Sequence, residues 1–262
     1  FVVFGVLGVQ ALTGGTNLGQ TVRDVFWRRA DRRTASAALT ALPPDAPADA
    51  AAITTTTTAT VDEAALDGAP VLTVEGITVQ FGALKALDDV SFQVPAASIM
   101  GLIGPNGAGK STFVDAISGF LPKHGGRVLL GDRDLAGLSP TRRARLGLRR
   151  TFQQDRVPPA LTVGAYVRFV ARRRLAASDI DEVLEFFGCP PARARLSSVD
   201  VGTRRLVEVA ANVISRPRLL ILDEPAAGLS HEEHLALAAR LLELPARYGV
   251  ALIIIEHDLD LV

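Results

Sequence analysis

Eight residues, Gly104 to Ser111, have the types and the spacing of a phosphate-binding loop. They read GPNGAGKS and follow the apolar stretch SIMGLI. Glycines allow backbone N–H groups to turn inward around an anion, and a helix that begins at Lys110 would direct its positive end at the phosphates. Lys110 would reach the β- and γ-phosphate oxygens, and the Ser111 hydroxyl would bind Mg²⁺. The residues expected to contact the nucleotide are Gly104, Pro105, Asn106, Gly107, Ala108, Gly109, Lys110, Ser111 and Thr112.

An acidic pair, Asp223 and Glu224, follows four apolar residues that are typical of a strand. Asp223 would lie beside the phosphate loop and bind Mg²⁺, directly or through water, while Glu224 would polarise the attacking water. The structural alternative for two adjacent acids is a strand-end cap. A GTPase is disfavoured, because Asp223 has no glycine three residues later and the sequence contains no Asn-Lys-x-Asp motif. A small-molecule kinase usually has neither a helical insert nor an acidic pair of this kind.

Strand and helix patterns alternate around these residues and predict an α/β fold. Continuous apolar runs in SIMGLI, RLLILDEP and VALIIIEHD indicate buried strands of a parallel sheet covered on both faces. Further strands are expected in VLTVEGITVQF, ALDDVSFQV and GRVLLGD. A helical insert is expected over about residues 155–212. The chain has 262 residues and 48% of them are hydrophobic, which is enough to form a sizeable α/β core.

Charge and cysteine content restrict the classes of function. The formal net charge is zero, so no global positive field favours nucleic acid as a partner. The densest basic run, TRRARLGLRR over residues 141–150, is predicted to be a solvated helix face. Cys189 is the single cysteine, which excludes an internal disulfide and fits a reducing compartment. We expect Cys189 to be structural rather than nucleophilic.

The two ends of the sequence suggest a fragment of a longer protein. The chain does not start with Met, and it stops at Val262 while still patterned as structure. Residues 1 to about 20 are predicted to end a last transmembrane helix, because an apolar opening is followed by five arginines within residues 23–33, as at a cytoplasmic exit. The alternative is an apolar terminus of a soluble protein. Residues 34–70, rich in Ala, Thr and Pro, are predicted to be a disordered linker before an ATPase domain over residues 71–262 that is truncated at its C-terminus.

From about Val71 to Val262 the chain resembles the nucleotide-binding subunit of ATP-binding cassette (ABC) transporters. Besides the phosphate loop and LDEP, it carries VQFG, RTFQ and IIIEHD in the family's order. VQFG implies that Phe81 packs on the adenine base. RTFQ matches the Q-loop, which implies that Gln153 contacts Mg²⁺ or water and the transmembrane partner. IIIEHD matches the switch region, which implies that His257 senses the γ-phosphate.

This resemblance implies a P-loop NTPase of ABC type, with a central, mostly parallel sheet, an antiparallel β edge subdomain and a helical insert. ATP and Mg²⁺ would be the cofactors. The metal would be held by Ser111, Gln153 and Asp223, and the catalytic residues would be Glu224, His257 and Gln153.

A narrower likeness to the branched-chain amino-acid uptake branch rests on FGALKALDDVSF, ARLGLRRTFQ, DEPAAGLS and IIIEHDLDLV. In that branch a permease is sometimes fused ahead of the ATPase. The likeness implies an importer subunit at the cytoplasmic face of the inner membrane. Its partners would be a second ABC ATPase subunit, permease subunits and an extracytoplasmic solute-binding protein, with no nucleic acid. Two other functions remain open, namely a soluble ABC ATPase of DNA repair or translation and a non-hydrolysing regulatory cassette.

One family motif departs from its usual form. The family signature, Leu-Ser-Gly-Gly-Gln, opens a helix that points at the partner's γ-phosphate, whereas the register set by RRLVEVA gives VDVGT over residues 199–203. Only Gly202 is unchanged. Asp200 would bring a carboxylate toward phosphate, and two anions about 4 Å apart repel by roughly 1 kcal/mol in water and by several in a drier site. The stretch LSS, residues 196–198, could serve instead if the loop shifted. Otherwise a heterodimer with one competent site is expected.

Overall fold

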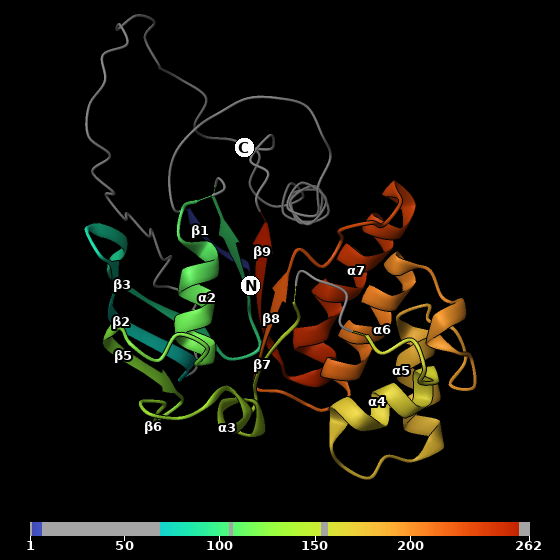
Figure 1. Ribbon diagram of the computed structural model, residues 1–262. Coiled ribbons are helices and arrows are strands. Elements are labelled where there is room, and N and C mark those ends of the chain that lie inside the picture. The colour runs from blue at the N-terminus through green and yellow to red at the C-terminus, as the bar shows by residue number, and fades with distance from the viewer. Residues whose placement is uncertain (1, 7–68, 105–106, 153–156, 257–262) are drawn as a thin grey trace, which may run out of the picture.

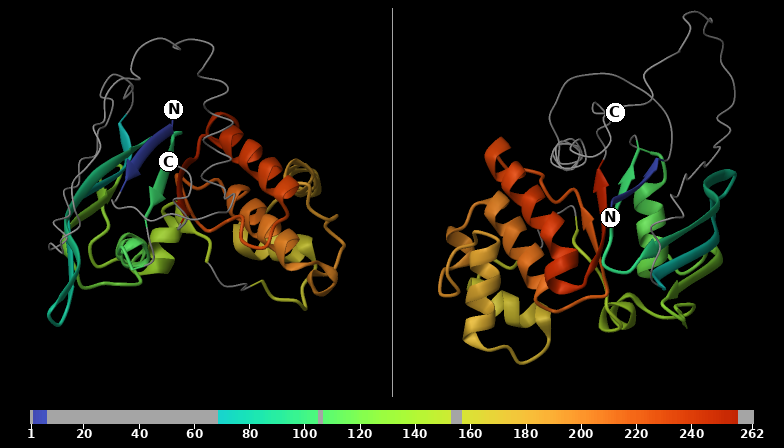
Figure 2. Two further views of the ribbon diagram at one scale, coloured as in Figure 1. Left: turned by 90° about the horizontal axis from the view of Figure 1, so that it is seen from above. Right: turned by 180° about the vertical axis from the view of Figure 1, so that it is seen from behind.

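The computed structural model describes residues 2–6, 69–104, 107–152 and 157–256. In the described part of the chain, a β-rich region and a helical region lie on opposite faces of one parallel sheet (Figure 1). The view from above in Figure 2 shows the same separation, with helix α2 and the antiparallel strands on one side and the helices that follow strand β7 on the other. This arrangement confirms the predicted α/β class.

The parallel sheet has the strand order β1-β4-β9-β8-β7. Every neighbouring pair in it is parallel. Its strands are β1 (Val2–Val6), β4 (Ile99–Ile103), β7 (Leu148–Arg150), β8 (Leu219–Asp223) and β9 (Ala251–Glu256). Parallel strands share one carboxyl edge, so the phosphate loop after β4 and the acidic pair at the end of β8 lie at the same edge of the sheet.

The second sheet is antiparallel and has the order β3-β2-β5-β6, which confirms the β edge subdomain. Its strands are β2 (Pro70–Phe81), β3 (Leu84–Pro95), β5 (Gly125–Leu130) and β6 (Arg133–Asp134). Strand β2 begins one residue before the predicted domain boundary.

The helices divide between the two sides of the parallel sheet. Those on the β-rich side are α2 (Lys110–Ser118) and α3 (Pro140–Arg145). Those on the other side are α4 (Val163–Ala171), α5 (Ala177–Phe186), α6 (Val201–Val213) and α7 (His231–Tyr248), with a short 3₁₀ turn over Leu196–Ser198. Helices α4 and α5 lie within the predicted insert, and α6 ends one residue beyond it.

Two hydrophobic clusters meet across the parallel sheet. Alternate residues of one strand serve different clusters: Leu220 and Leu222 of β8 pack with the helical side, while Leu219 and Ile221 pack with α2 and the antiparallel strands. The two faces of the strand are therefore both buried, which explains why its sequence is continuously apolar rather than alternating. Because both faces of β8 are packed, the position of Asp223 at its carboxyl end is well fixed.

The basic run 141–150 was predicted to be a solvated helix face, and that prediction is wrong for Arg143, Arg149 and Arg150. Arg143 is buried, and its guanidinium donates to the carbonyl oxygens of Ala116 and Ile117, at 3.0 and 2.7 Å, at the end of α2. The carbonyl groups of a last helical turn lack partners within the helix, which makes them acceptors for such a cation. Arg149 and Arg150 lie on strand β7 and are also partly buried.

Most of the segment before residue 69 lies outside the described residues. Val2–Val6 form a strand, not part of a helix, and the rest of the predicted membrane segment and linker stays a prediction. Within the described part of the chain, no helix combines the length and the apolar composition that crossing a membrane requires.

Candidate functional site

The phosphate loop connects the end of β4 to the start of α2, as predicted. Helix α2 begins at Lys110, and its N-cap Gly109 has φ +86° and offers no side chain to the first turn. A Cβ at Gly109 would come within 2.6 Å of the Ala86 carbonyl oxygen, so only glycine fits there. Among the described residues, no side-chain hydrogen bond caps the first turn of α2, and an anion is the ligand that the amide groups of such a helix start favour. Pro105 and Asn106 lie outside the described residues.

Lys110 lies inside this loop with its side chain directed back along it. The residue is buried, and its Nζ donates to the carbonyl oxygen of Gly104. Burial lowers the pKa of Lys110, and the nearby carboxylates of Glu224, Asp223 and Glu256 oppose that shift. The lysine and the acidic pair therefore lie near one another at the carboxyl edge of the parallel sheet.

The acidic pair lies at the carboxyl end of β8. Burial raises the pKa of Asp223 above its usual range, and the guanidinium of Arg150, 3.6 Å from Asp223 Oδ2, opposes the rise. Glu224 has φ +46°, in the left-handed region that a residue with a Cβ rarely adopts, and its N–H donates to the Ile255 carbonyl at 3.2 Å. Such strained backbone is typical of functional positions.

The residues present fit a Mg²⁺ ion that is shared with phosphate. Ser111 follows Lys110 in the first turn of α2 and is exposed, and Asp223 supplies a carboxylate. Among the described residues, no group of three or more His, Cys, Asp or Glu could bind a metal by itself. Mg²⁺ commonly binds one or two protein oxygens, completed by substrate phosphates and water, so this sparse donor set suits it.

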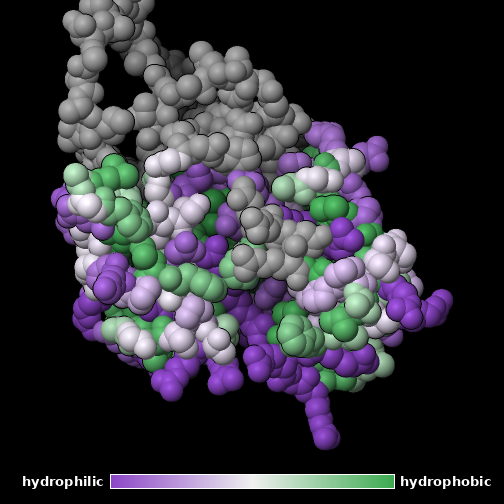
Figure 3. All heavy atoms as spheres, in the orientation of Figure 1, coloured by the Kyte–Doolittle hydropathy of each residue, from purple (hydrophilic) through white to green (hydrophobic). Residues whose placement is uncertain are grey.

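The turn between β2 and β3 exposes hydrophobic side chains where the base of a nucleotide is expected. Phe81 ends β2, pairs across the turn with Leu84, and is 51% exposed. Hydrophobic side chains gather at the upper left of the face in Figure 3, over this β2–β3 turn. An exposed aromatic ring at the edge that carries the phosphate loop is available for stacking.

Asp200 does not present a free carboxylate. It is the N-cap of α6, and its two oxygens accept from the Thr203 N–H at 2.8 Å and the Thr203 hydroxyl at 2.6 Å. These hydrogen bonds lower the pKa of Asp200. A Cβ on Gly202 would come within 2.8 Å of Leu229, in the segment that follows Glu224. The helix start therefore packs closely against the loop after the acidic pair.

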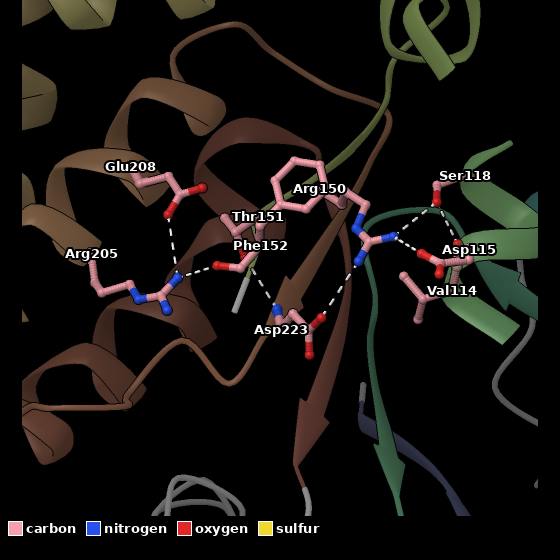
Figure 4. A network of polar contacts seen from close by, with 9 residues as sticks. All are labelled: Val114, Asp115, Ser118, Arg150, Thr151, Phe152, Arg205, Glu208 and Asp223. Atoms are coloured by element: carbon pink, nitrogen blue, oxygen red, sulfur yellow. Dashed lines mark hydrogen bonds and ion pairs between the residues drawn. The ribbon is translucent and has the colours of Figure 1, made fainter. Parts of the chain in front are cut away.

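Two further predicted site residues, Gln153 and His257, also lie outside the described residues. The residue before Gln153 is nevertheless tied to the signature helix, because Arg205 of α6 donates to the Phe152 carbonyl and also pairs with Glu208 at 3.6 Å (Figure 4). The sequence analysis missed Arg150 and Arg205 as site residues. Their only signal was the density of arginine near the RTFQ and signature motifs.

Cys189 agrees with the structural role predicted for it. Burial raises the pKa of its thiol to about 12, so the thiolate needed for nucleophilic attack is scarce at neutral pH.

Comparisons with known proteins agree with this geometry. The family profile described as ABC transporter matches residues 87–227. The high-affinity branched-chain amino acid transport ATP-binding protein LivG of Escherichia coli K12 is 34% identical over 214 residues, which cover 74% of this chain and 84% of LivG. The corresponding protein BraF of Pseudomonas aeruginosa is 33% identical over 219 residues, with the same coverage. The ADP conformation of MJ1267, an ATP-binding cassette of an ABC transporter, has a TM-score of 0.65 and 29% identity and covers 74% of this chain and 83% of that one. The chain belongs to the ABC transporter family, as one of its ATP-hydrolysing subunits.

Proposed function

We propose that this chain binds Mg²⁺ and ATP at residues 104–112 and hydrolyses ATP to drive import of a small solute. The observation that carries the proposal is the placement of an uncapped, glycine-led helix start beside Asp223 and Glu224 at one edge of the parallel sheet. The names of LivG and BraF support branched-chain amino acids as the solute. A soluble ABC ATPase of DNA repair or translation has no observation in its favour here.

The residues would divide the chemistry in a definite way. Lys110 would bind the β- and γ-phosphate oxygens, while the first-turn amides of α2 would hold the phosphate chain. Glu224 would orient and deprotonate the attacking water at the γ-phosphate. Phe81 would stack on the adenine. Gln153 and His257 keep the roles that the family resemblance implies, at the metal and at the γ-phosphate.

Mg²⁺ would be held by Ser111 and Asp223, with Gln153 as a further ligand. When bound, it neutralises charge that develops on the phosphate oxygens. The partly buried site strengthens this effect, because electrostatic interactions weaken as solvent access increases.

The proposed partners are a second ABC ATPase subunit, permease subunits and an extracytoplasmic solute-binding protein, at the cytoplasmic face of the inner membrane. We further propose a heterodimer. The Asp200 carboxylate occupies the start of α6, which in this family faces the nucleotide of the partner subunit. A homodimer would carry that carboxylate at both composite sites, whereas a heterodimer would carry it at one.

Two measurements test the proposal. The purified full chain should release phosphate from ATP only when Mg²⁺ is present, and a chain that does not bind ATP would contradict the assignment of the loop. Import of labelled leucine into vesicles that contain the chain with its permease and binding protein tests the solute. Import that is equally fast with a Glu224→Gln subunit would show that this chain does not drive it.

A further inference from the structure

Arg150 lies between the two elements that hold the phosphate and metal ends of the site. It ends strand β7 and its side chain is 11% exposed. One guanidinium nitrogen, Nη1, lies 2.5 Å from Asp115 Oδ1 and 3.2 Å from the Ser118 hydroxyl, both on α2. The other, Nη2, lies 3.6 Å from Asp223 Oδ2 (Figure 4). A single side chain thus connects the helix of the phosphate loop to the carboxylate at the end of β8.

Two aromatic rings restrict where this guanidinium can go. Its central carbon lies 4.7 Å from the ring centre of Phe152 and 5.5 Å from that of Phe120. The two rings contact each other edge to face, with their centres 5.7 Å apart. A planar cation packed against aromatic rings loses little further freedom when it pairs with a carboxylate. Arg150 is therefore a rigid link rather than a flexible surface charge.

The neighbouring residue fixes the backbone at the same point. The Thr151 hydroxyl accepts from the Asp223 N–H at 3.1 Å, and the Thr151 N–H donates to the Ile221 carbonyl at 2.9 Å. Strand β7 consequently holds the main chain of Asp223 through Thr151 and its side chain through Arg150. Only the second contact acts on the carboxylate orientation.

We propose that Arg150 is a positioning residue that orients the Asp223 carboxylate toward the metal by holding its Oδ2 from the side of α2. The inference rests on the proposed Mg²⁺ site. It assigns Oδ2 to the guanidinium and leaves Oδ1 for the metal or its water. Partners that hold metal-binding groups in this way typically change metal affinity by about 10- to 100-fold when they are removed.

The competing possibility is that the guanidinium only neutralises Asp223 until a metal displaces it. Removal of the cation would then strengthen metal binding, because two positive charges would no longer compete for one carboxylate. The two possibilities thus predict opposite signs for one measurement.

The measurement is the dissociation constant of Mn²⁺, used in place of Mg²⁺, for the full chain loaded with a non-hydrolysable ATP analogue. The loss of the free Mn²⁺ signal in electron paramagnetic resonance reports it. Arg150→Gln should raise this constant about tenfold or more. Affinity for the analogue in EDTA should stay within about twofold, because the phosphate loop is untouched. An unchanged or lower Mn²⁺ constant would overturn the inference.

Two further variants keep the test decisive if Arg150→Gln does not fold. Asp115→Asn, at a side chain that is 44% exposed, removes the anchor of Arg150 and should weaken Mn²⁺ in the same direction. Arg149→Gln is the matched control, because Arg149 is the adjacent strand residue and donates instead to the Val170 carbonyl at 2.9 Å. It should leave the Mn²⁺ constant unchanged, and an equal loss in this control would contradict a specific role for Arg150.

Asp223→Asn distinguishes a failure of the proposed metal site from a failure of the proposed role of Arg150. If it weakens Mn²⁺ while Arg150→Gln and Asp115→Asn do not, the metal site stands and the positioning role of Arg150 is wrong. If Asp223→Asn has no effect, the proposed metal site itself is wrong.

Discussion

Helix α2 begins near the acidic pair and helix α6 begins against the loop that follows it, but their first turns are built in opposite ways. The N-cap of α2 is Gly109, which offers no side chain to the four amide groups of the first turn. The N-cap of α6 is Asp200, whose carboxylate already accepts from Thr203. One helix start is open to an external anion, and the other contains an internal one.

From this difference we expect an external phosphate to bind better at the start of α2, where the chain supplies no anion of its own. Both starts have the same favourable dipole, which is worth roughly 0.3–1 kcal/mol for a nearby negative charge. At α6 that stabilisation is used by Asp200, so a phosphate that approaches there meets a carboxylate. The two helix starts that this chain would contribute to composite sites, those of α2 and α6, therefore differ in whether they can accept a phosphate.

The largest effect is expected at Glu224, near the open start of α2, where one substitution should distinguish ATP hydrolysis from ATP binding. Glu224→Gln should slow ATP hydrolysis by roughly 10² or more, the range for loss of a general base. ATP affinity should be retained, because the glutamine keeps the size of the side chain and the amides of α2 are unchanged. Phosphate release and fluorescent-nucleotide binding on the same preparation check both parts. Unchanged turnover would exclude Glu224 from this role.

A smaller effect is expected from a substitution in the phosphate loop itself. Lys110→Ala removes a charged hydrogen-bond donor to phosphate, worth about 1.5–3 kcal/mol, so ATP affinity should fall roughly 10- to 100-fold. Lys123→Ala is the control, because Lys123 is exposed and lies beyond the end of α2. Equal nucleotide affinity in parent and Lys110→Ala, by fluorescence titration, would contradict the assignment of the phosphate loop.

The smallest effect is expected at the start of α6, where Asp200 is the N-cap. Asp200→Ala should lower the free energy of unfolding by about 1 kcal/mol, because α6 loses its N-cap, whereas Asp200→Asn should keep most of it. The pKa of Asp200 is lowered in the fold, so the charge-dependent part is complete above its unfolded value of about 3.9 and is lost as pH falls through the folded value. Urea unfolding at pH 7 and near pH 3 measures both. An Asp200→Ala chain as stable as the parent at pH 7 would mean that the cap contributes nothing.

The sequence predicted best those features that depend on a short stretch of neighbouring residues. The start of α2 at Lys110 and the buried strand before Asp223 were predicted correctly, since glycine geometry and continuous apolar runs are local signals. The cap role of Asp200 was missed, although Asp is one of the residue types most favoured at a helix N-cap.

The arginines show what a single sequence cannot provide. Arg143 and Arg150 belong to one basic run, but one binds the last carbonyls of α2 and the other binds two carboxylates. The guanidinium of Arg143 reaches Leu135, Ile117 and Ala116, which lie 8, 26 and 27 residues away, and that of Arg150 reaches Asp115, 35 residues away. Spacing within the run carries no information about these partners, so only the fold reveals which arginines are buried.

The central claim, that Asp200 closes the start of α6 to a partner's phosphate, is tested most directly by repair. ATPase rate is measured against protein concentration for the full chain and for the same chain with Leu-Ser-Gly-Gly-Gln in place of residues 199–203. We predict slow hydrolysis in the parent with little dependence on concentration. The repaired chain should gain about tenfold in closure per site for each ~1.4 kcal/mol of repulsion removed. A parent that already hydrolyses ATP rapidly and in a concentration-dependent way, or a repaired chain that gains nothing, would contradict the claim.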